Sequence, residues 1–268
     1  MKACKGMLKP LQVLYRNRNM IYQTTMNDIR SRYAGSFMGL AWAVLYPLLF
    51  LGSYACVYIF IFDAKYEGFN TVEYVILIFC GLVPFIGFQE ALMSGTSCIV
   101  ANAGLMKNTL FPIELVPVKT IFSVQTTQVA GTVMILIALG LISRLSIYTP
   151  LVLVMWIIQM LFNIGLIWIL SSINVIARDL QNIIGIITMF LMMVSPIAYP
   201  VDMVPDMLRP FLKLNPLYYI ISSYQDVLIF QRAPRAETFI PFLLMSIILF
   251  ILGYQFFIKM KRVFVDNV

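Results

Sequence analysis

Long runs without a charged side chain constrain this chain more than any other feature. A transmembrane helix needs about 20 predominantly apolar residues to cross about 30 Å of hydrocarbon, and six windows reach that length. They cover residues 36–62, 74–100, 120–143, 146–174, 180–201 and 239–258. The whole chain is 61% hydrophobic and only 12% charged, which is far from the composition of a soluble domain. We therefore predict an all-α integral membrane protein with six transmembrane helices.

The basic residues predict how the chain lies in the membrane. If both termini are cytoplasmic, 13 of the 19 Lys and Arg residues fall on the cytoplasmic side, as the positive-inside rule requires. Seven of them precede the first window, where no apolar run has the length of a signal peptide, so we expect no cleaved leader. The net charge of +7 is explained by anionic lipid headgroups. We therefore expect membrane lipids, and no nucleic acid, as partners.

Neither catalysis nor a metal site is indicated. The chain has no histidine, and its four cysteines include no CxxC pair, so a proton relay, a zinc site and a disulfide framework all lack their usual parts. We expect no enzymatic activity, no metal and no cofactor in this chain. Glu90 is the only ionisable residue well inside a window, which makes it a functional candidate. The sequence turns polar from Gln89 onward, so we favour a structural role for Glu90 near the cytoplasmic interface.

Two cytoplasmic segments are predicted outside the windows. Residues 1–33 alternate apolar and basic positions, which predicts one or two amphipathic helices broken near the sequence RNRN. Residues 102–118 follow the second window, and Pro112 and Pro117 frame a short segment there. Proline suits the first turn of a helix. A brief helix carrying Phe111 and Glu114 would dock well on a cytoplasmic partner.

The segment 202–236 lies on the other side of the membrane. Its middle is too polar to span cleanly, yet the stretch around Tyr218 and Tyr219 is too apolar for an open loop. We predict two short periplasmic gate helices that re-enter the outer leaflet, with Pro210 and Pro216 as helix breakers. Residues 34–268 as a whole are predicted to form the transmembrane domain.

Five motifs in order carry a resemblance to a known family. They are RSRYAGSFMGLAW with a following YP, then ANAGLMKNTLFPIELVP, NVIARDLQNI, SPIAYPVDMVP and LNPLYYII. This pattern resembles the membrane subunit of type 2 ATP-binding-cassette (ABC-2) exporters of surface polysaccharides, and most of all the O-antigen export permeases of lipopolysaccharide synthesis. The resemblance runs over nearly the whole chain.

The resemblance implies a fold, partners and a substrate. It implies the six-span ABC-2, or type V exporter, fold in the bacterial inner membrane, working as a homodimer with two copies of a separate phosphate-loop ATPase that binds ATP and Mg. The implied substrate is a polysaccharide linked to a polyprenyl pyrophosphate. The chain itself has no GxxxxGK[ST] phosphate loop, which agrees with an ATPase on another polypeptide.

The resemblance also assigns residues to the coupling of the two subunits. The loop positions that match the family's ATPase-coupling helix are Asn102, Lys107, Phe111, Pro112, Glu114 and Pro117. Ile113 stands where many relatives carry a basic residue, which leaves the polar details of docking open. Arg178 and Asp179 match the signature of the second cytoplasmic loop, and we favour a local ion pair at a span end for them.

An aromatic stripe in the first window predicts where the substrate passes. A step of four residues advances about 400°, so side chains at this spacing stay on one side of a helix. The stripe consists of Trp42, Tyr46, Phe50, Tyr54 and Tyr58. In the family, spans 1 and 5 line the conduit, and span 5 offers Thr188, Met192, Ser195 and Tyr199 at helical spacing. We favour a conduit for sugar rings over the alternative, ordinary helix packing.

Arg30 and Arg32 precede the stripe at the predicted inner surface. They are placed to attract the pyrophosphate of a lipid carrier, and the alternative is plain positive-inside anchoring.

Other function classes remain open. The first is a permease for capsular polysaccharide or teichoic acid, the second an exporter of a small lipid or drug, and the third an ATP-independent lipid flippase. The flippase would need no coupling loop.

Overall fold

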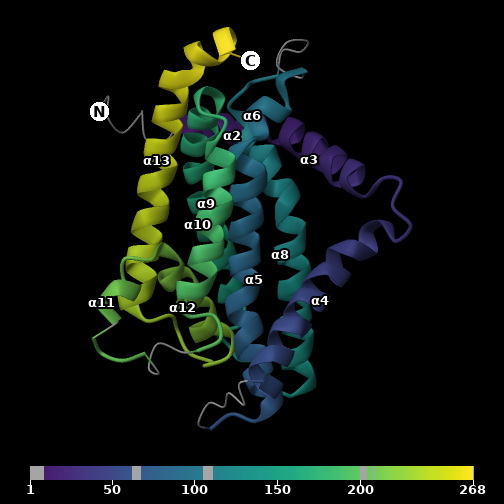
Figure 1. Ribbon diagram of the computed structural model, residues 1–268, viewed down its shortest axis with the longest axis vertical. Coiled ribbons are helices and arrows are strands. Elements are labelled where there is room, and N and C mark those ends of the chain that lie inside the picture. The colour runs from purple at the N-terminus through teal and green to yellow at the C-terminus, as the bar shows by residue number, and fades with distance from the viewer. Residues whose placement is uncertain (1–8, 62–67, 105–110, 200–203, 208, 268) are drawn as a thin grey trace.

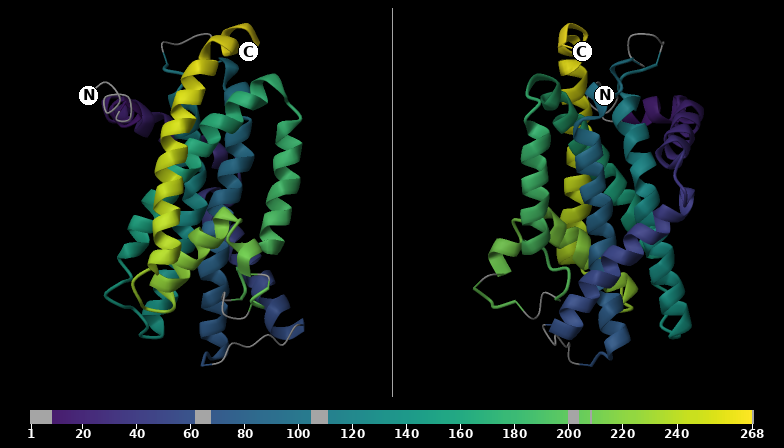
Figure 2. Two further views of the ribbon diagram at one scale, coloured as in Figure 1. Left: turned by 90° about the vertical axis from the view of Figure 1, so that its left-hand side faces the viewer. Right: turned by 45° about the vertical axis from the view of Figure 1, so that its right-hand side comes forward.

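The computed structural model describes residues 9–61, 68–104, 111–199, 204–207 and 209–267, and this part of the chain is a bundle of helices without strands (Figure 1). The first described helix and the last turns of α13 lie at the same end of the bundle (Figures 1 and 2). The all-α prediction is therefore confirmed for the described residues.

The helices follow one another with short connections. They are α2 (Lys9–Arg16), α3 (Arg18–Tyr33), the 3-10 turn η1 (Gly39–Ala41), α4 (Trp42–Cys56), the π-helical turn η2 (Val57–Ile61), α5 (Thr71–Thr96), α6 (Cys98–Ala101), α8 (Leu115–Leu141), α9 (Leu151–Ile176), α10 (Leu180–Val194), α11 (Arg209–Leu212), α12 (Pro216–Leu228) and α13 (Ala236–Asn267). Asn70 caps α5, since its side chain accepts a hydrogen bond from the Glu73 backbone N–H while the Glu73 carboxylate accepts one from the Asn70 N–H.

Five helices are long and apolar enough to cross a membrane, which makes this a multi-pass membrane protein; they are α4 with η2, α5, α8, α9 and α13. The fifth predicted span, 180–201, is instead α10, whose 15 residues extend only about 22 Å. The helix stops because Pro196 disfavours a helical conformation at the preceding residue, and Ser195 is indeed extended, with a ψ of 145°. The count of six spans stays a prediction.

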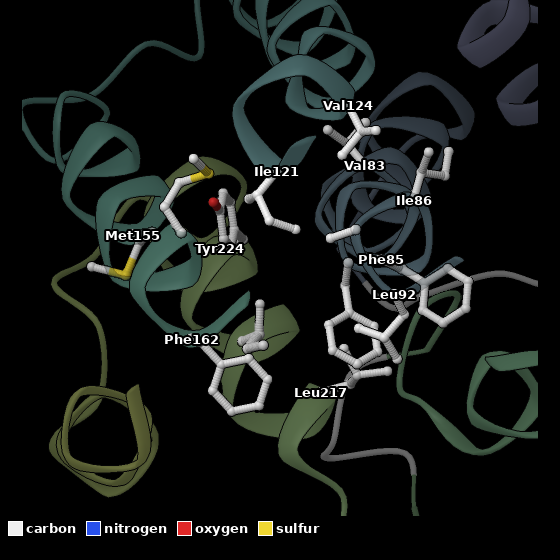
Figure 3. Packing of buried hydrophobic residues seen from close by; sticks show 14 of the residues in the cluster. Val83, Phe85, Ile86, Leu92, Ile121, Val124, Met155, Phe162, Leu217 and Tyr224 are labelled. Carbon is white, nitrogen blue, oxygen red and sulfur yellow. The ribbon is translucent and has the colours of Figure 1, made fainter. Parts of the chain in front are cut away.

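Helix α5 is the centre of the bundle. The most apolar stretch of α5 is 78% buried, whereas the corresponding stretch of α4 with η2 is only 17% buried. Buried side chains of α5, α8, α9 and α12 belong to one core, among them Phe85, Val124, Phe162 and Tyr224 (Figure 3). Figure 1 shows α4 crossing the bundle obliquely from α3. The weakly buried α4 leaves much of its surface to lipid or to another chain.

The segment that follows α10 is buried without being helical. Tyr74 donates a hydrogen bond to the Ala198 carbonyl oxygen (2.9 Å), and Gln225 donates one to the Pro196 carbonyl oxygen (3.2 Å). A buried carbonyl needs such a partner because no water reaches it. The segment lies so close to α5 that a Cβ on Gly81 would come within 2.7 Å of the Ile197 carbonyl oxygen.

The two short helices predicted in 202–236 are present as α11 and α12, while their periplasmic side stays a prediction. Proline has the position that we expected in only one of them: Pro216 opens α12 behind the Asn215 cap, whereas Pro210 is the second residue of α11 and does not break it. This is consistent with the first turn of a helix, where a missing N–H costs nothing. Asp226 of α12 is fully buried and ion-paired with Arg232 (2.6 Å) and Arg235 (3.1 Å). How deeply these helices enter a membrane stays a prediction.

Helices α9 and α13 cross in close contact through two glycines. A Cβ on Gly165 would lie 2.4 Å from the Leu249 carbonyl carbon, and a Cβ on Gly253 would lie 2.1 Å from the Gly165 carbonyl oxygen. Beside the crossing, the Trp168 ring packs against Phe250 and Tyr254, with centroids 5.1 and 5.3 Å apart. Small residues bring helix backbones together in membranes, where van der Waals packing holds helices.

Substitution of Gly165 by alanine is expected to weaken this crossing, because the added methyl group meets backbone atoms that cannot rotate away. We expect a loss of about 1–3 kcal/mol, seen as a lower unfolding temperature of the detergent-purified chain. Gly140→Ala is the control, since its nearest neighbour is a side-chain atom of Leu145 at 3.7 Å. Equal unfolding temperatures for the two variants would show that the crossing does not depend on Gly165.

Candidate functional site

The aromatic stripe lies along one side of α4, as the spacing predicts. The rings of Tyr46 and Phe50 are stacked with centroids 6.3 Å apart, and those of Tyr54 and Tyr58 with centroids 4.9 Å apart. The turn changes from α to π at Val57, and the Tyr54–Tyr58 stack persists across that change. The stripe therefore forms two stacked pairs, one near the start of the helix and one near its end.

The second pair meets the segment after α10. Tyr54, Tyr58, Met192, Met193, Ser195 and Tyr199 line a pocket of about 260 Å³. The Tyr54 and Tyr58 hydroxyls lie 3.4 Å apart. Residues about 140 positions apart in the sequence thus form one wall, made mostly of tyrosine and methionine side chains. This wall combines two of the stripe residues with three of the four that the sequence selects in the fifth window.

Three of the predicted channel residues also make contacts that belong to the fold. Thr188 is buried, and its hydroxyl donates to the Gly185 carbonyl oxygen (2.9 Å). Ser195 is also buried; its hydroxyl donates to the Leu191 carbonyl oxygen (2.6 Å) and accepts a hydrogen bond from the Asn215 amide (2.9 Å). Phe50 is half-buried and packs against the core. A lining role for these three side chains stays a prediction.

The first two stripe residues, Trp42 and Tyr46, line a different pocket. About 450 Å³ in volume, it is lined by Arg32, Tyr33, Trp42, Tyr46, Ile86, Gln89, Glu90, Met93, Ser94 and Thr127. The Thr127 hydroxyl donates to Glu90 Oε2 (3.0 Å), and the Arg32 guanidinium lies 3.6 Å from the same oxygen. Of the two arginines that the sequence selects, Arg32 therefore lies in this pocket, while Arg30 is exposed on α3.

In the described part of the expected coupling loop, the segment between Pro112 and Pro117 is not a separate short helix. Phe111–Glu114 is a turn that leads directly into α8, and Pro117 lies within the first helical turn of α8. Glu114 connects three elements: its carboxylate accepts from Lys261 of α13 (2.9 Å), and its backbone carbonyl accepts from the Trp168 indole N–H of α9 (3.1 Å). Lys107 lies outside the described residues.

Asn102 is committed to local structure at the end of α6. Its side-chain amide donates to the Cys98 carbonyl oxygen (2.8 Å). Arg178 and Asp179 are both exposed between α9 and α10, and no ion pair between them is found in the part of the chain that the structure describes. The favoured local pair is therefore wrong for this structure: two exposed neighbours gain little from pairing in water.

Sequence reasoning missed the ion pair that holds α3 against the bundle. Helix α3 was expected to be amphipathic, but its apolar residues are spread around it and only Ile21 is buried. The Lys119 ammonium of α8 is instead paired with the Asp28 carboxylate at 2.8 Å, and only 2% of the Lys119 side chain is exposed. A lysine at the edge of an apolar window was the available signal, because a buried cation needs a counter-charge.

The comparisons with known proteins agree with this architecture. The model of the ABC-2 type transporter family matches residues 20–229. The chain belongs to the ABC-2 type transporter family. It is 27% identical over 269 residues, 98% of this chain and all of the relative, to the O-antigen export system permease protein RfbA of Myxococcus xanthus.

Further relatives divide into two groups by their names. An O-antigen export system permease protein RfbA of Klebsiella pneumoniae is 28% identical over 92% of this chain and 94% of its own length. The polysialic acid transport protein KpsM of Escherichia coli is 22% identical over 75% of this chain and 78% of its own length. The relatives are thus named for O-antigen export and for polysialic acid transport, and the family resemblance is confirmed.

Replacement of Asp28 by asparagine is expected to leave the Lys119 ammonium buried without a counter-charge. Because Asp28 is partly exposed, we expect a loss at the lower end of the range for broken buried pairs, about 3 kcal/mol, measured by thermal unfolding of the purified chain. Adding Lys119→Met should recover most of that loss. Asp206→Asn, which removes an exposed pair with Arg209, is the control; an equal loss there would contradict the importance of burial.

Proposed function

We propose that this chain is the permease subunit of an ATP-driven exporter that moves a polyprenyl-pyrophosphate-linked polysaccharide of the O-antigen type across the bacterial inner membrane. In this proposal two copies of the chain form the pathway, and two copies of a phosphate-loop ATPase bind ATP and Mg. Both termini are cytoplasmic, as the positive-inside count favours. The subunit itself performs no chemistry.

The observation that carries this proposal is the wall of Tyr54, Tyr58, Met192 and Tyr199. Flat rings with hydroxyls at their edges suit a sugar chain that must slide, because apolar faces of the rings attract without holding many fixed hydrogen bonds. Met193, which lines the same pocket, is largely exposed in the single chain. A closed path therefore needs a second wall, which the second copy supplies in this proposal.

Arg30 and Arg32 would meet the anionic end of the substrate. Arg32 is the more strongly supported of the two, because it lies in the pocket beside Trp42 and Tyr46, where the stripe begins. Guanidinium groups bind phosphate with paired hydrogen bonds. The pyrophosphate would thus enter where the aromatic pathway starts.

The turn Phe111–Glu114 is proposed to couple the permease to the ATPase. Through Glu114 and the start of α8 it contacts α9 and α13 directly. A push on this turn therefore acts on three long helices at once, as a rigid-body movement requires. The positions proposed for this coupling are those that match the family's coupling helix, and Phe111 among them is half-buried.

Two alternatives have different support. The likeness to a polysialic acid transport protein favours a capsular polysaccharide as the second candidate substrate, with the same mechanism. An ATP-independent flippase and an exporter of small lipids or drugs lack a comparable observation.

Truncation of Phe111 to alanine is expected to release the ATPase. We expect a phosphate-loop ATPase to copurify in equal amount with the wild-type chain and to be lost, together with ATP hydrolysis, from the variant. Phe211→Ala, which truncates an exposed phenylalanine of α11, should keep both. Recovery of the wild-type chain alone after mild solubilisation would overturn the ATP-driven mechanism and favour the independent flippase.

Removal of the Tyr54 ring is expected to stop export while the complex stays assembled. For Tyr54→Ala we expect lipid-linked glycan to accumulate in the inner membrane, with an unchanged amount of bound ATPase. Tyr54→Phe keeps the ring and should export. Normal surface glycan in cells with Tyr54→Ala would argue that the stripe only packs helices.

A further inference from the structure

The pocket at the start of α4 lies in the angle between α3 and the bundle. Gly35 and Gly39 both have positive φ angles, 76° and 51°, and turn the chain sharply between α3 and α4. Figure 1 shows α3 and α4 meeting at this elbow, away from α5 and α8. The lining residues come from all four of these helices. The pocket therefore exists only because α3 and α4 are folded back on α5 and α8.

Among the described residues, Arg32 and Glu90 are the only charged side chains that line the pocket, and they are joined by a weak contact. The Arg32 guanidinium lies 3.6 Å from Glu90 Oε2, which is too far for a hydrogen bond. The Arg32 side chain is 37% exposed, and that of Glu90 only 16%. The Thr127 hydroxyl contacts the same oxygen, Oε2, so among the described residues Oε1 has no donor. Arg32 can thus turn to an anion more readily than Glu90 can leave its place.

The uncharged part of the lining has the chemistry of a sugar site. Trp42 and Tyr46 are exposed residues, 40% and 51% accessible, and an apolar sugar face can lie on their rings. The Gln89 amide and the Ser94 hydroxyl add donors and acceptors for sugar hydroxyls. A volume of about 450 Å³ is within the range of ligand pockets and leaves room for a short piece of glycan.

A neutral pair of opposite charges also argues against a site for phosphate alone. The Glu90 carboxylate would repel an anion placed beside Arg32. It would instead accept hydrogen bonds from hydroxyl groups next to that anion. The ligand that fits has an anionic end and a hydroxyl-bearing ring joined directly to it.

We propose that this pocket is an entry subsite that binds the sugar attached directly to the pyrophosphate of the lipid carrier. The pyrophosphate draws Arg32 away from Glu90, and the freed carboxylate accepts hydroxyl hydrogen bonds from the sugar while Trp42 and Tyr46 pack against its ring. The subsite recognises the carrier-proximal sugar before the chain enters the tyrosine-lined path. This inference rests on the proposed function, which supplies the class of substrate.

The test is equilibrium binding to the full chain, purified in lipid nanodiscs with whatever subunits accompany it. The probes are radiolabelled lipid-linked oligosaccharide extracted from cells that lack export, bare polyprenyl pyrophosphate, and the oligosaccharide released from its carrier by mild acid. We expect the wild type to bind the lipid-linked form on the order of ten-fold more tightly than the bare carrier. The free oligosaccharide should bind more weakly than either.

Two substitutions separate the roles of the charged residues. Glu90→Gln should remove most of the preference for the sugar-bearing lipid and leave, or even improve, binding of the bare carrier. Arg32→Gln should weaken binding of both lipids on the order of ten-fold or more. Glu237→Gln, an exposed carboxylate in the first turn of α13, is the control and should change neither. Unchanged unfolding temperatures would exclude a general loss of structure.

The outcomes distinguish this subsite from the proposed function. If the wild type binds both lipids with equal affinity, and Glu90→Gln retains that pattern, the subsite is wrong although the exporter stands. If the wild type binds neither lipid, and export of the glycan does not depend on the chain, the proposed function itself fails. Tighter binding of the free oligosaccharide than of the lipid-linked form would also overturn the subsite.

Discussion

The bundle depends on one constraint: in hydrocarbon every backbone N–H and C=O group needs a partner within the protein. Long helices meet this requirement alone, but the segment Ser195–Ala198 is buried and non-helical. There, side chains supply the hydrogen bonds that a helix would make within its own backbone: Tyr74 and Gln225 donate to carbonyl oxygens of the segment. Gly81 admits the segment against α5. The position of Tyr199, and with it the tyrosine wall, follows from these contacts.

The same principle governs the charged residues of the described chain. Lys119 with Asp28, Glu114 with Lys261 and Asp226 with its two arginines each join elements that are distant in the sequence or at a turn. Each buried or half-buried charge has a counter-charge, as the low dielectric requires. The Arg32–Glu90 contact, at 3.6 Å, is longer than any of these. A ligand can separate a weak ion pair in a pocket more readily than a tight one.

Sequence patterns predicted much of the candidate site and little of its geometry. The period of four in the aromatic residues was enough to place them on one side of α4, because helical geometry is local. Their division between two pockets was not predictable, since it depends on how α4 crosses α5 and α8. For the same reason the sequence singled out Glu90 as an isolated acid but did not show that Arg32 and Thr127 lie beside it. The two prolines before α8 led us to predict a separate short helix, where the structure has a turn and the first turn of α8. Proline is compatible with both conformations.

The sequence by itself determined the helical class, the approximate spans and the family, because these follow from apolar length, local periodicity and motifs in order. Only the tertiary structure decided that the fifth window holds a short helix followed by a buried extended segment. It also decided that Glu114 contacts α9 and α13, and that Arg32 faces Glu90. Such contacts join residues up to about 150 positions apart, and their geometry is set by packing of whole helices, which no local pattern encodes.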